Sequence, residues 1–237
     1  MRLIDVKTLE FKDCIGTPDP YAILSHTWGE DEVSFRDFGD EQKRTTQRGF
    51  QKIKFASQQA LDDGISYVWV DTCCINKESS AELSEAINSM FKWYERAKVC
   101  YAYLEDVSDL AASLSSSRWF TRGWTLQELI APRSIQFFGT GWKILGSKES
   151  LLRLLVEITN IDITILAGTS KLSQVSVAER MRWASHRQTT REEDTAYCLM
   201  GIFDVNMAML YGEGPKAFIR LQEEIMKETD DQTLFAW

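Results

Sequence analysis

The sequence predicts an α/β fold in which a mostly parallel sheet is flanked by helices and is followed by a helical C-terminal extension. Short apolar runs, most of them ending in polar residues, alternate with segments of helical apolar spacing over roughly the first 140 residues. Such alternation is typical of parallel sheets with helices on their faces. Beyond Trp142 the apolar runs stop and helical patterns follow one another, which predicts the extension.

Four apolar runs are predicted to be strands. They cover residues 21–25, 67–71, 99–104 and 134–138. The second run is rich in β-branched and aromatic residues and ends in Asp71. In open parallel sheets, ligands bind beyond the carboxyl ends of the strands. We therefore expect function in the polar clusters that follow these runs.

The segments between the runs are predicted to be helices. Residues 49–62 form the first helix, and residues 124–130 form a short one that Pro132 stops. Between them an amphipathic helix is indicated by Leu83, Ala86, Ile87, Met90, Tyr94 and Ala97. Ser79 or Ser80 is available as its N-cap.

The extension is predicted to contain helices over residues 151–158, 177–186, 192–201 and 215–227. We expect residues 1–237 to form one domain, with an α/β core over 1–145 and a helical part over 146–237 packed on it. The acidic and polar stretch 227–232 is typical of a domain edge, so we expect further domains in the native protein.

Composition and charge exclude several classes of protein. The formal net charge is -8, which disfavours nucleic acid as a general partner. Apolar runs are far shorter than the roughly 20 residues that a membrane-spanning helix needs, and residues 1–6 do not resemble a secretory signal. The five cysteines are odd in number and scattered, as in a reduced protein. We expect a cytoplasmic protein with no membrane span.

The cluster around Glu128 is the strongest candidate for chemistry. If residues 124–130 are helical, Trp124 and Glu128 stand at i and i+4 on one face. A planar base could stack on Trp124 while Glu128 holds a ribose hydroxyl or stabilises positive charge at an anomeric carbon. In the structural alternative, Trp124 packs in the core and Glu128 pairs with Arg122 or Arg118.

A second cluster follows the first two predicted strands. Ser25, His26 and Trp28 place a hydroxyl, an imidazole and an indole directly after the first strand. His26 is the obvious candidate for proton transfer, and Asp71 could reach the same crevice. The alternatives are a structural histidine and a capping aspartate.

Other chemistry has weaker support in the sequence. Cys73 and Cys74 are adjacent and lack the spacing of a zinc site, although either thiol could act as a nucleophile with His26 as base. No phosphate-binding glycine motif is present. Acidic residues 192–194 suit the first turn of a helix, whereas Arg191 on a loop would suit a phosphate.

Several of these segments resemble one known family. Residues 21–29, 69–77 and 122–129 are similar to the three blocks of the fungal heterokaryon incompatibility (HET) domain, and residues 189–197 and 210–214 are similar to its later segments. The resemblance implies a role in fungal non-self recognition, a form of innate immunity in which such domains trigger programmed cell death. They often form the N-terminal effector of a receptor that carries a nucleotide-binding oligomerisation module and repeats.

HET domains in turn resemble TIR domains, which have a flavodoxin-like sheet and in many cases hydrolyse NAD. Residues 124–129 are similar to the TIR block Trp-Cys-Leu-x-Glu-Leu, whose glutamate is catalytic, and this maps the role onto Glu128. Thr125 departs from that block, residues 31–49 do not match a TIR loop, and the helical part has no TIR counterpart.

The resemblance therefore implies a TIR-like effector that, once oligomerised, hydrolyses NAD at the nicotinamide N-glycosidic bond. Glu128 would bind ribose hydroxyls and stabilise the oxocarbenium-like state in an open, nucleotide-sized hollow. The expected substrate-binding residues are Ser25, His26, Trp28, Asp71, Arg122 and Trp124. NAD is the substrate, and no metal or other cofactor is expected.

The expected partners are further copies of the chain and a nucleotide-binding receptor module. In the alternative, the domain has no enzymatic activity and triggers death by recruiting protein partners.

Overall fold

The computed structural model describes residues 1–108 and 114–236. In these two ranges the strands form one sheet in the order β2-β1-β4-β3-β5-β6-β7. Its centre consists of four parallel strands: β4 (Tyr67–Trp69), β3 (Tyr21–His26), β5 (Val99–Tyr103) and β6 (Ile135–Gly139). The α/β class and all four predicted strands are confirmed.

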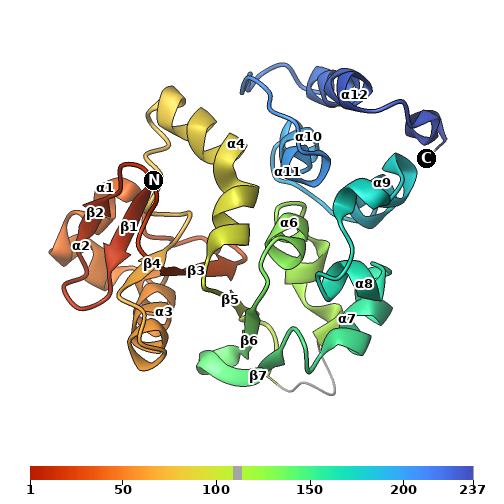
Figure 1. Ribbon diagram of the computed structural model, residues 1–237. Coiled ribbons are helices and arrows are strands. Elements are labelled where there is room, and N and C mark those ends of the chain that lie inside the picture. The colour runs from red at the N-terminus through yellow and green to blue at the C-terminus, as the bar shows by residue number, and fades with distance from the viewer. Residues whose placement is uncertain (109–113, 237) are drawn as a thin grey trace.

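The order of the four central strands places a switch point in the sheet. The chain begins the parallel part with β3, adds β4 on one side of it, and then adds β5 and β6 on the other side (Figure 1). This is the order of doubly wound, flavodoxin-like sheets, in which ligands bind where neighbouring connections diverge. Here that place is the carboxyl end of β3 and β5.

Three further strands complete the sheet at its edges, and all three are antiparallel to their neighbours. They are β1 (Arg2–Asp5), β2 (Phe11–Asp13) and β7 (Lys143–Ser147). The expectation that only helices follow Trp142 is wrong, because Gly141 and Trp142 both adopt positive φ and turn the chain back along β6. Strand β7 also crosses the expected boundary between residues 145 and 146.

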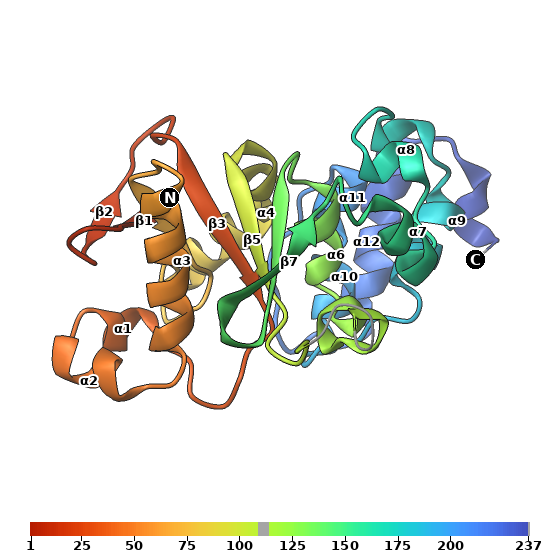
Figure 2. The same ribbon diagram turned by 90° about the horizontal axis from the view of Figure 1, so that it is seen from below.

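The three helices predicted between the strands are confirmed. They are α3 (Phe50–Asp62), α4 (Ser80–Arg96) and α6 (Thr125–Ile130). Ser79 is the N-cap of α4, and its hydroxyl accepts a hydrogen bond from the backbone of Glu82. Helix α3 covers one face of the sheet, whereas α4 and α6 lie together on the other face (Figures 1 and 2).

The C-terminal helices gather beside α4 and α6 (Figure 1). They are α7 (Leu152–Thr159), α8 (Ile163–Leu166), α9 (Val177–Ala184), α10 (Asp194–Tyr197), α11 (Met200–Phe203) and α12 (Lys216–Glu228). Three of the four predicted helices are confirmed to within two residues at each end. The single helix predicted over 192–201 is wrong: the chain forms α10 and α11 instead. Gly201 lies so close to α4 that an added Cβ would be 2.2 Å from Cβ of Phe91, so α11 packs directly on α4.

The remaining short elements lie in the connections. They are α1 (Phe35–Phe38), α2 (Glu41–Thr46), and the 3-10 turns η1 (Leu114–Ser116), η2 (Arg118–Thr121), η3 (Thr140–Trp142), η4 (Leu172–Gln174) and η5 (Gln232–Phe235). Within the described residues, no helix combines the length and the apolar character needed to cross a membrane.

Candidate functional site

Helix α6 fixes Glu128 against the centre of the sheet. All six residues of this helix are buried, and Glu128 itself is only 6% exposed. The helix begins after Trp124, where the Thr125 hydroxyl donates a hydrogen bond to the carbonyl oxygen of Arg122 (2.9 Å). A short helix with no solvent-facing side has little freedom to rotate, so the direction of the Glu128 side chain is set by packing.

The Glu128 carboxyl meets Ser25 near the carboxyl end of β3. The Ser25 hydroxyl donates a hydrogen bond to Oε2 of Glu128 and accepts one from Nε1 of Trp119 (2.8 Å). Ser25 is fully buried. The indole N–H occupies a lone pair of the hydroxyl oxygen and thereby directs the hydroxyl proton toward the carboxyl. Trp119, which the sequence analysis did not select, is thus part of this centre.

The surroundings of Glu128 favour its protonated form. Burial, and secondarily the negative charge of Asp71, raise the pKa of Glu128 to about 8, against smaller opposing effects of Ser25, Tyr94 and Arg187. The carboxyl is therefore mostly neutral at pH 7.

The alternative in which Glu128 pairs with a neighbouring arginine does not occur. Nη2 of Arg118 donates to the carbonyl oxygen of Trp28 (3.4 Å), and Nη2 of Arg122 donates to the Thr190 hydroxyl (3.2 Å). Among the described residues, neither guanidinium forms an ion pair with Glu128.

Asp71, which follows β4, is the acid of a second centre. Its Oδ1 lies 3.2 Å from Nε2 of His26, and its Oδ2 accepts a hydrogen bond from Nε1 of Trp28 (2.8 Å). The Lys77 ammonium lies 3.6 Å from the centre of the Trp28 ring. Burial alone would raise the pKa of Asp71, but contacts with His26, the charge of Lys77 and the bond from Trp28 outweigh it and lower the pKa. Asp71 is therefore ionised at pH 7.

The structure brings together five of the seven predicted site residues. Ser25, His26 and Trp28 follow one another at the end of β3, Asp71 contacts the last two, and Glu128 contacts the first. Because the Asp71 charge is felt at Glu128, the two centres form one electrostatic unit. We call this set the β3-edge site.

The other two predicted residues point toward the helical part of the chain. Trp124 is hydrogen-bonded to Asp194 at the start of α10, and Arg122 contacts Thr190. The backbone of Arg122 also pairs with that of Gln188. No contact in the described residues links either side chain to Ser25 or Glu128.

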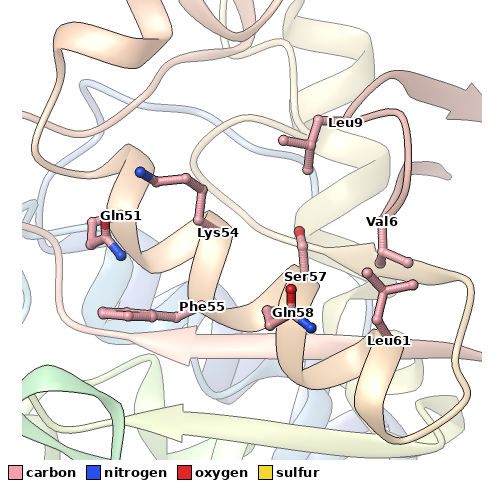
Figure 3. A pocket seen from close by; sticks show the side chains of 8 residues that line it. All are labelled: Val6, Leu9, Gln51, Lys54, Phe55, Ser57, Gln58 and Leu61. Atoms are coloured by element: carbon pink, nitrogen blue, oxygen red, sulfur yellow. The ribbon is translucent and has the colours of Figure 1, made fainter.

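Glu128 and Ser25 are enclosed, whereas an open hollow was expected beside Glu128. Three cavities of about 310, 310 and 350 Å³ lie elsewhere, and Glu128 lines none of them. One lies on the opposite face of the sheet, where α3 faces the chain after β1, and includes Leu9 and Ser57 (Figure 3). Trp28, which is 46% exposed, and Asp71, whose side chain is 18% exposed, are parts of the β3-edge site that reach the surface.

The cysteines that follow β4 are not placed as nucleophiles. Cys73 and Cys74 are buried and contact the backbone of Val70. Burial raises the pKa of the Cys73 thiol well above its ordinary value, so the reactive thiolate is disfavoured. Within residues 1–108 and 114–236, no three His, Cys, Asp or Glu side chains are grouped as metal ligands would be.

Residues 189–197 and 210–214, the two later segments that resemble the HET family, contact each other. The Glu193 carboxylate accepts hydrogen bonds from the backbone N–H groups of Gly212 (2.7 Å) and Gly214 (3.2 Å). The guanidinium of Arg191 lies 4.4 Å from the centre of the Tyr211 ring. These contacts give both blocks a structural role, and Arg191 stacks on an aromatic ring here.

The fold and the β3-edge site define a doubly wound α/β domain with a buried glutamate–serine pair at the switch point of its sheet. Residues 21–117 match the family described as heterokaryon incompatibility protein (HET), and residues 216–237 match a domain of unknown function (DUF8212). The chain belongs to the heterokaryon incompatibility family.

A curated relative extends the likeness beyond residue 117. The chain is 50% identical over 226 residues to vegetative incompatibility protein HET-E-1 of Podospora anserina. The alignment covers 90% of this chain but only 16% of that relative, so the chain spans a small part of the relative's length. No solved structure matches the chain.

Proposed function

We propose that this chain is a cell-death effector domain of fungal non-self recognition that hydrolyses the nicotinamide N-glycosidic bond of NAD when oligomerised. Family membership and the relative's name, vegetative incompatibility protein, support the biological role. The enzymatic part depends on one observation, the pairing of Glu128 with Ser25 at the switch point of the sheet. The flavodoxin-like strand order supports a relationship to TIR domains.

In this proposal the ionised Glu128 carboxylate acts on the ribose that carries nicotinamide. It binds ribose hydroxyls and stabilises the positive charge that develops as the C–N bond to nicotinamide breaks. Nicotinamide leaves as a neutral molecule with the bonding electron pair. Water then adds to the ribose carbon and loses a proton, which gives ADP-ribose. NAD is the substrate, and the residues supply binding and electrostatic stabilisation without a further cofactor.

The enclosed, protonated state of Glu128 represents the resting form. Burial is the largest cause of its raised pKa, so exposure to water or substrate hydroxyls would return the pKa toward 4.5. One rearrangement would therefore both open the site and charge the carboxylate. We assign that rearrangement to assembly of several copies, because a toxic NAD hydrolase must be silent as a monomer.

The route to Glu128 passes through the exposed part of the β3-edge site. Trp28 reaches the surface and is held by Asp71 below it and Lys77 above its ring. Movement of Trp28 would uncover Asp71 and His26, and the indole could then stack on a base of the substrate. Arg122 and Trp124 remain proposed substrate contacts only if the same rearrangement turns them from Thr190 and Asp194.

A non-enzymatic role is the second candidate, and the burial of Glu128 favours it. A carboxyl that is 6% exposed and satisfied by Ser25 can serve as a structural core group. The domain would then trigger death by recruiting partner proteins. In either case we propose that a nucleotide-binding receptor module, fused to this domain or recruiting it, brings copies together, as the much greater length of the relative suggests.

The test is nicotinamide release from NAD by purified, concentrated protein whose assembly is followed by light scattering. We expect release by the wild type and by Glu149→Gln, an exposed control, and background release by Glu128→Ala and Glu128→Gln. If the assembled wild type releases no more nicotinamide than Glu128→Ala, the enzymatic proposal is wrong. Survival of killing activity in fungal cells that express Glu128→Gln would support the recruiting role.

A further inference from the structure

One of the three cavities described above lies behind α6, the helix that carries Glu128. It has a volume of about 310 Å³ and opens between α9, α10, α12 and the loop before α6. Met181, Ala184, Leu199 and Phe218 give it a largely apolar lining. We call this space the Arg187 cavity, because Arg187 also lines it.

The Arg187 guanidinium has no acidic partner among the described residues. Its bonds within residues 1–108 and 114–236 go to neutral oxygens: the carbonyls of Trp183 (3.3 Å) and Arg122 (3.0 Å) and the hydroxyl of Thr125 (2.9 Å). These three bonds use Nε and Nη1. A guanidinium carries five N–H groups, so the described residues leave the pair on Nη2 for another acceptor.

The charge of Arg187 is nevertheless present at neutral pH. Burial lowers the pKa of Arg187 to about 10, and the guanidinium therefore stays protonated at pH 7. Glu128 is too far away for an ion pair and is itself mostly neutral, so it offers little compensation. Arg187 is half-buried, so its charge is only partly solvated, and an anion in the cavity would offset the remaining desolvation cost.

We propose that the Arg187 cavity binds a small organic carboxylate with an apolar body. The carboxylate would accept hydrogen bonds from the N–H groups of Arg187, and the hydrocarbon body would lie against Met181, Leu199 and Phe218. The apolar lining and the single guanidinium favour a monocarboxylate over a phosphate, which needs more donors to balance its larger charge.

The position of this cavity links it to the β3-edge site. Gly123 lines the cavity and directly precedes Trp124, after which α6 begins. An added Cβ on Gly123 would lie 2.5 Å from Cγ2 of Thr189 and 3.1 Å from Sγ of Cys198, so the wall is tightly packed here. A bound anion would also neutralise the positive charge that Glu128 now experiences from Arg187. The cavity is therefore placed to act as an effector site.

The experiment compares two probes of nearly equal shape, 4-phenylbutyrate and its neutral amide, by calorimetry and thermal unfolding. We expect the carboxylate to raise the Tm of the wild type by about 3 °C at ten times its Kd. The amide should bind about tenfold more weakly, because hydrogen bonds to a charged acceptor are stronger.

Three variants locate the binding. Ala184→Phe fills the cavity while keeping Arg187, and Arg187→Met removes the charge; both should abolish the response to the carboxylate. Arg191→Met, which changes an arginine outside the cavity, should retain it. If Arg187→Met fails to fold, Ala184→Phe decides alone. Absence of binding at millimolar carboxylate, equal binding of the amide, or full binding by Ala184→Phe would each overturn the proposal.

Discussion

Glu128, which is buried, and Asp71, which is partly buried, are two acids at the same edge of the sheet, and their pKa values move in opposite directions. Glu128 is enclosed by side chains with one hydroxyl donor from Ser25, and its pKa rises to about 8. Asp71 contacts His26 and the Trp28 indole and lies close to the Lys77 charge, and its pKa falls. One acid is thus mostly neutral at pH 7 while its neighbour is ionised.

Burial is the largest cause of the raised pKa of Glu128, whereas hydrogen-bond donors and the nearby Lys77 charge keep Asp71 ionised. Two titratable groups driven apart in pKa are a common arrangement in sites that perform acid–base or electrostatic chemistry. Here the ionised Asp71 also raises the pKa of Glu128, so the two centres reinforce their difference. The predictions below test this contrast.

The largest expected effect is on the pH dependence of stability. The folded-state pKa of Glu128 is about 8 against an ordinary 4.5, so its contribution is fully present below pH 4.5 and is lost as the pH rises to 8. Relative to Glu128→Gln, the wild type should lose about 3 to 4 kcal/mol of unfolding free energy over that range. Urea unfolding at several pH values measures this. Parallel pH curves for the two proteins would contradict it.

The next effect concerns Asp71 at pH 7. Asp71→Ala leaves the buried His26 without its Nε2 partner and removes the negative charge near Lys77, so we expect a loss of about 2 to 3 kcal/mol. The pKa of Asp71 is lowered, so this contribution is present above 3.8 and is lost as the pH falls through the lower folded-state value. Asp230→Ala, at an exposed aspartate, is the control in urea unfolding. Equal stability of the two variants would contradict the role of Asp71.

A smaller effect follows from the hydroxyl that joins Glu128 to Trp119. Ser25→Ala removes the acceptor of the buried Trp119 indole and should cost about 1 to 2 kcal/mol. It should also raise the pKa of Glu128 further, because the Ser25 hydrogen bond lowers it. A double-mutant cycle with Trp119→Phe should show that the two losses are not additive. Strict additivity would show that the hydroxyl and the indole act independently.

The smallest effect concerns the cation above Trp28. Lys77→Met should cost about 0.5 kcal/mol, since the contact lies at a partly exposed ring. It should also raise the pKa of Asp71 toward its ordinary value, because Lys77 lowers it. Lys77→Arg keeps the charge and serves as the control. Quenching of Trp28 fluorescence by iodide should increase in Lys77→Met alone, and unchanged quenching would show that Lys77 does not hold the ring.

Much of the fold could be predicted from local patterns. Strands β3 to β6 are buried and apolar, so their sequence runs stand out, and Ser79 marks the start of α4. Strands β2 and β7 are the two edge strands and have partly exposed or exposed residues, and both end residues of β1 are partly exposed, so their patterns are weak. Helix α11 packs on α4 where Gly201 meets Phe91, a tertiary contact that no local pattern encodes.

The site could be predicted only in part, because many of its contacts join residues that are far apart in the sequence. Ser25 and Glu128 are 103 positions apart, and the resemblance to TIR domains predicted that they share a site. The rule that strand ends share one edge predicted only that Asp71 lies near Ser25 and His26. Trp124 and Arg122 are close to Glu128 in sequence, but both lie before the first residue of α6. Their side chains contact Asp194 and Thr190 in the helical part of the chain. Trp119 donates a hydrogen bond to Ser25, the partner of Glu128, and the charge of Arg187 acts on Glu128. Both interactions result from tertiary packing, which the sequence pattern does not reveal.

Carboxyl carbon NMR of the protein labelled in Glu and Asp side chains tests the central contrast most directly, with Glu128→Gln and Asp71→Asn providing the assignments. We expect Glu128 to titrate near pH 8 and Asp71 to stay ionised to below pH 3.8. We also expect Asp71→Asn to lower the Glu128 midpoint. Titration of both groups near their ordinary values, or a Glu128 midpoint that Asp71→Asn leaves unchanged, would show that the two acids do not differ in this way.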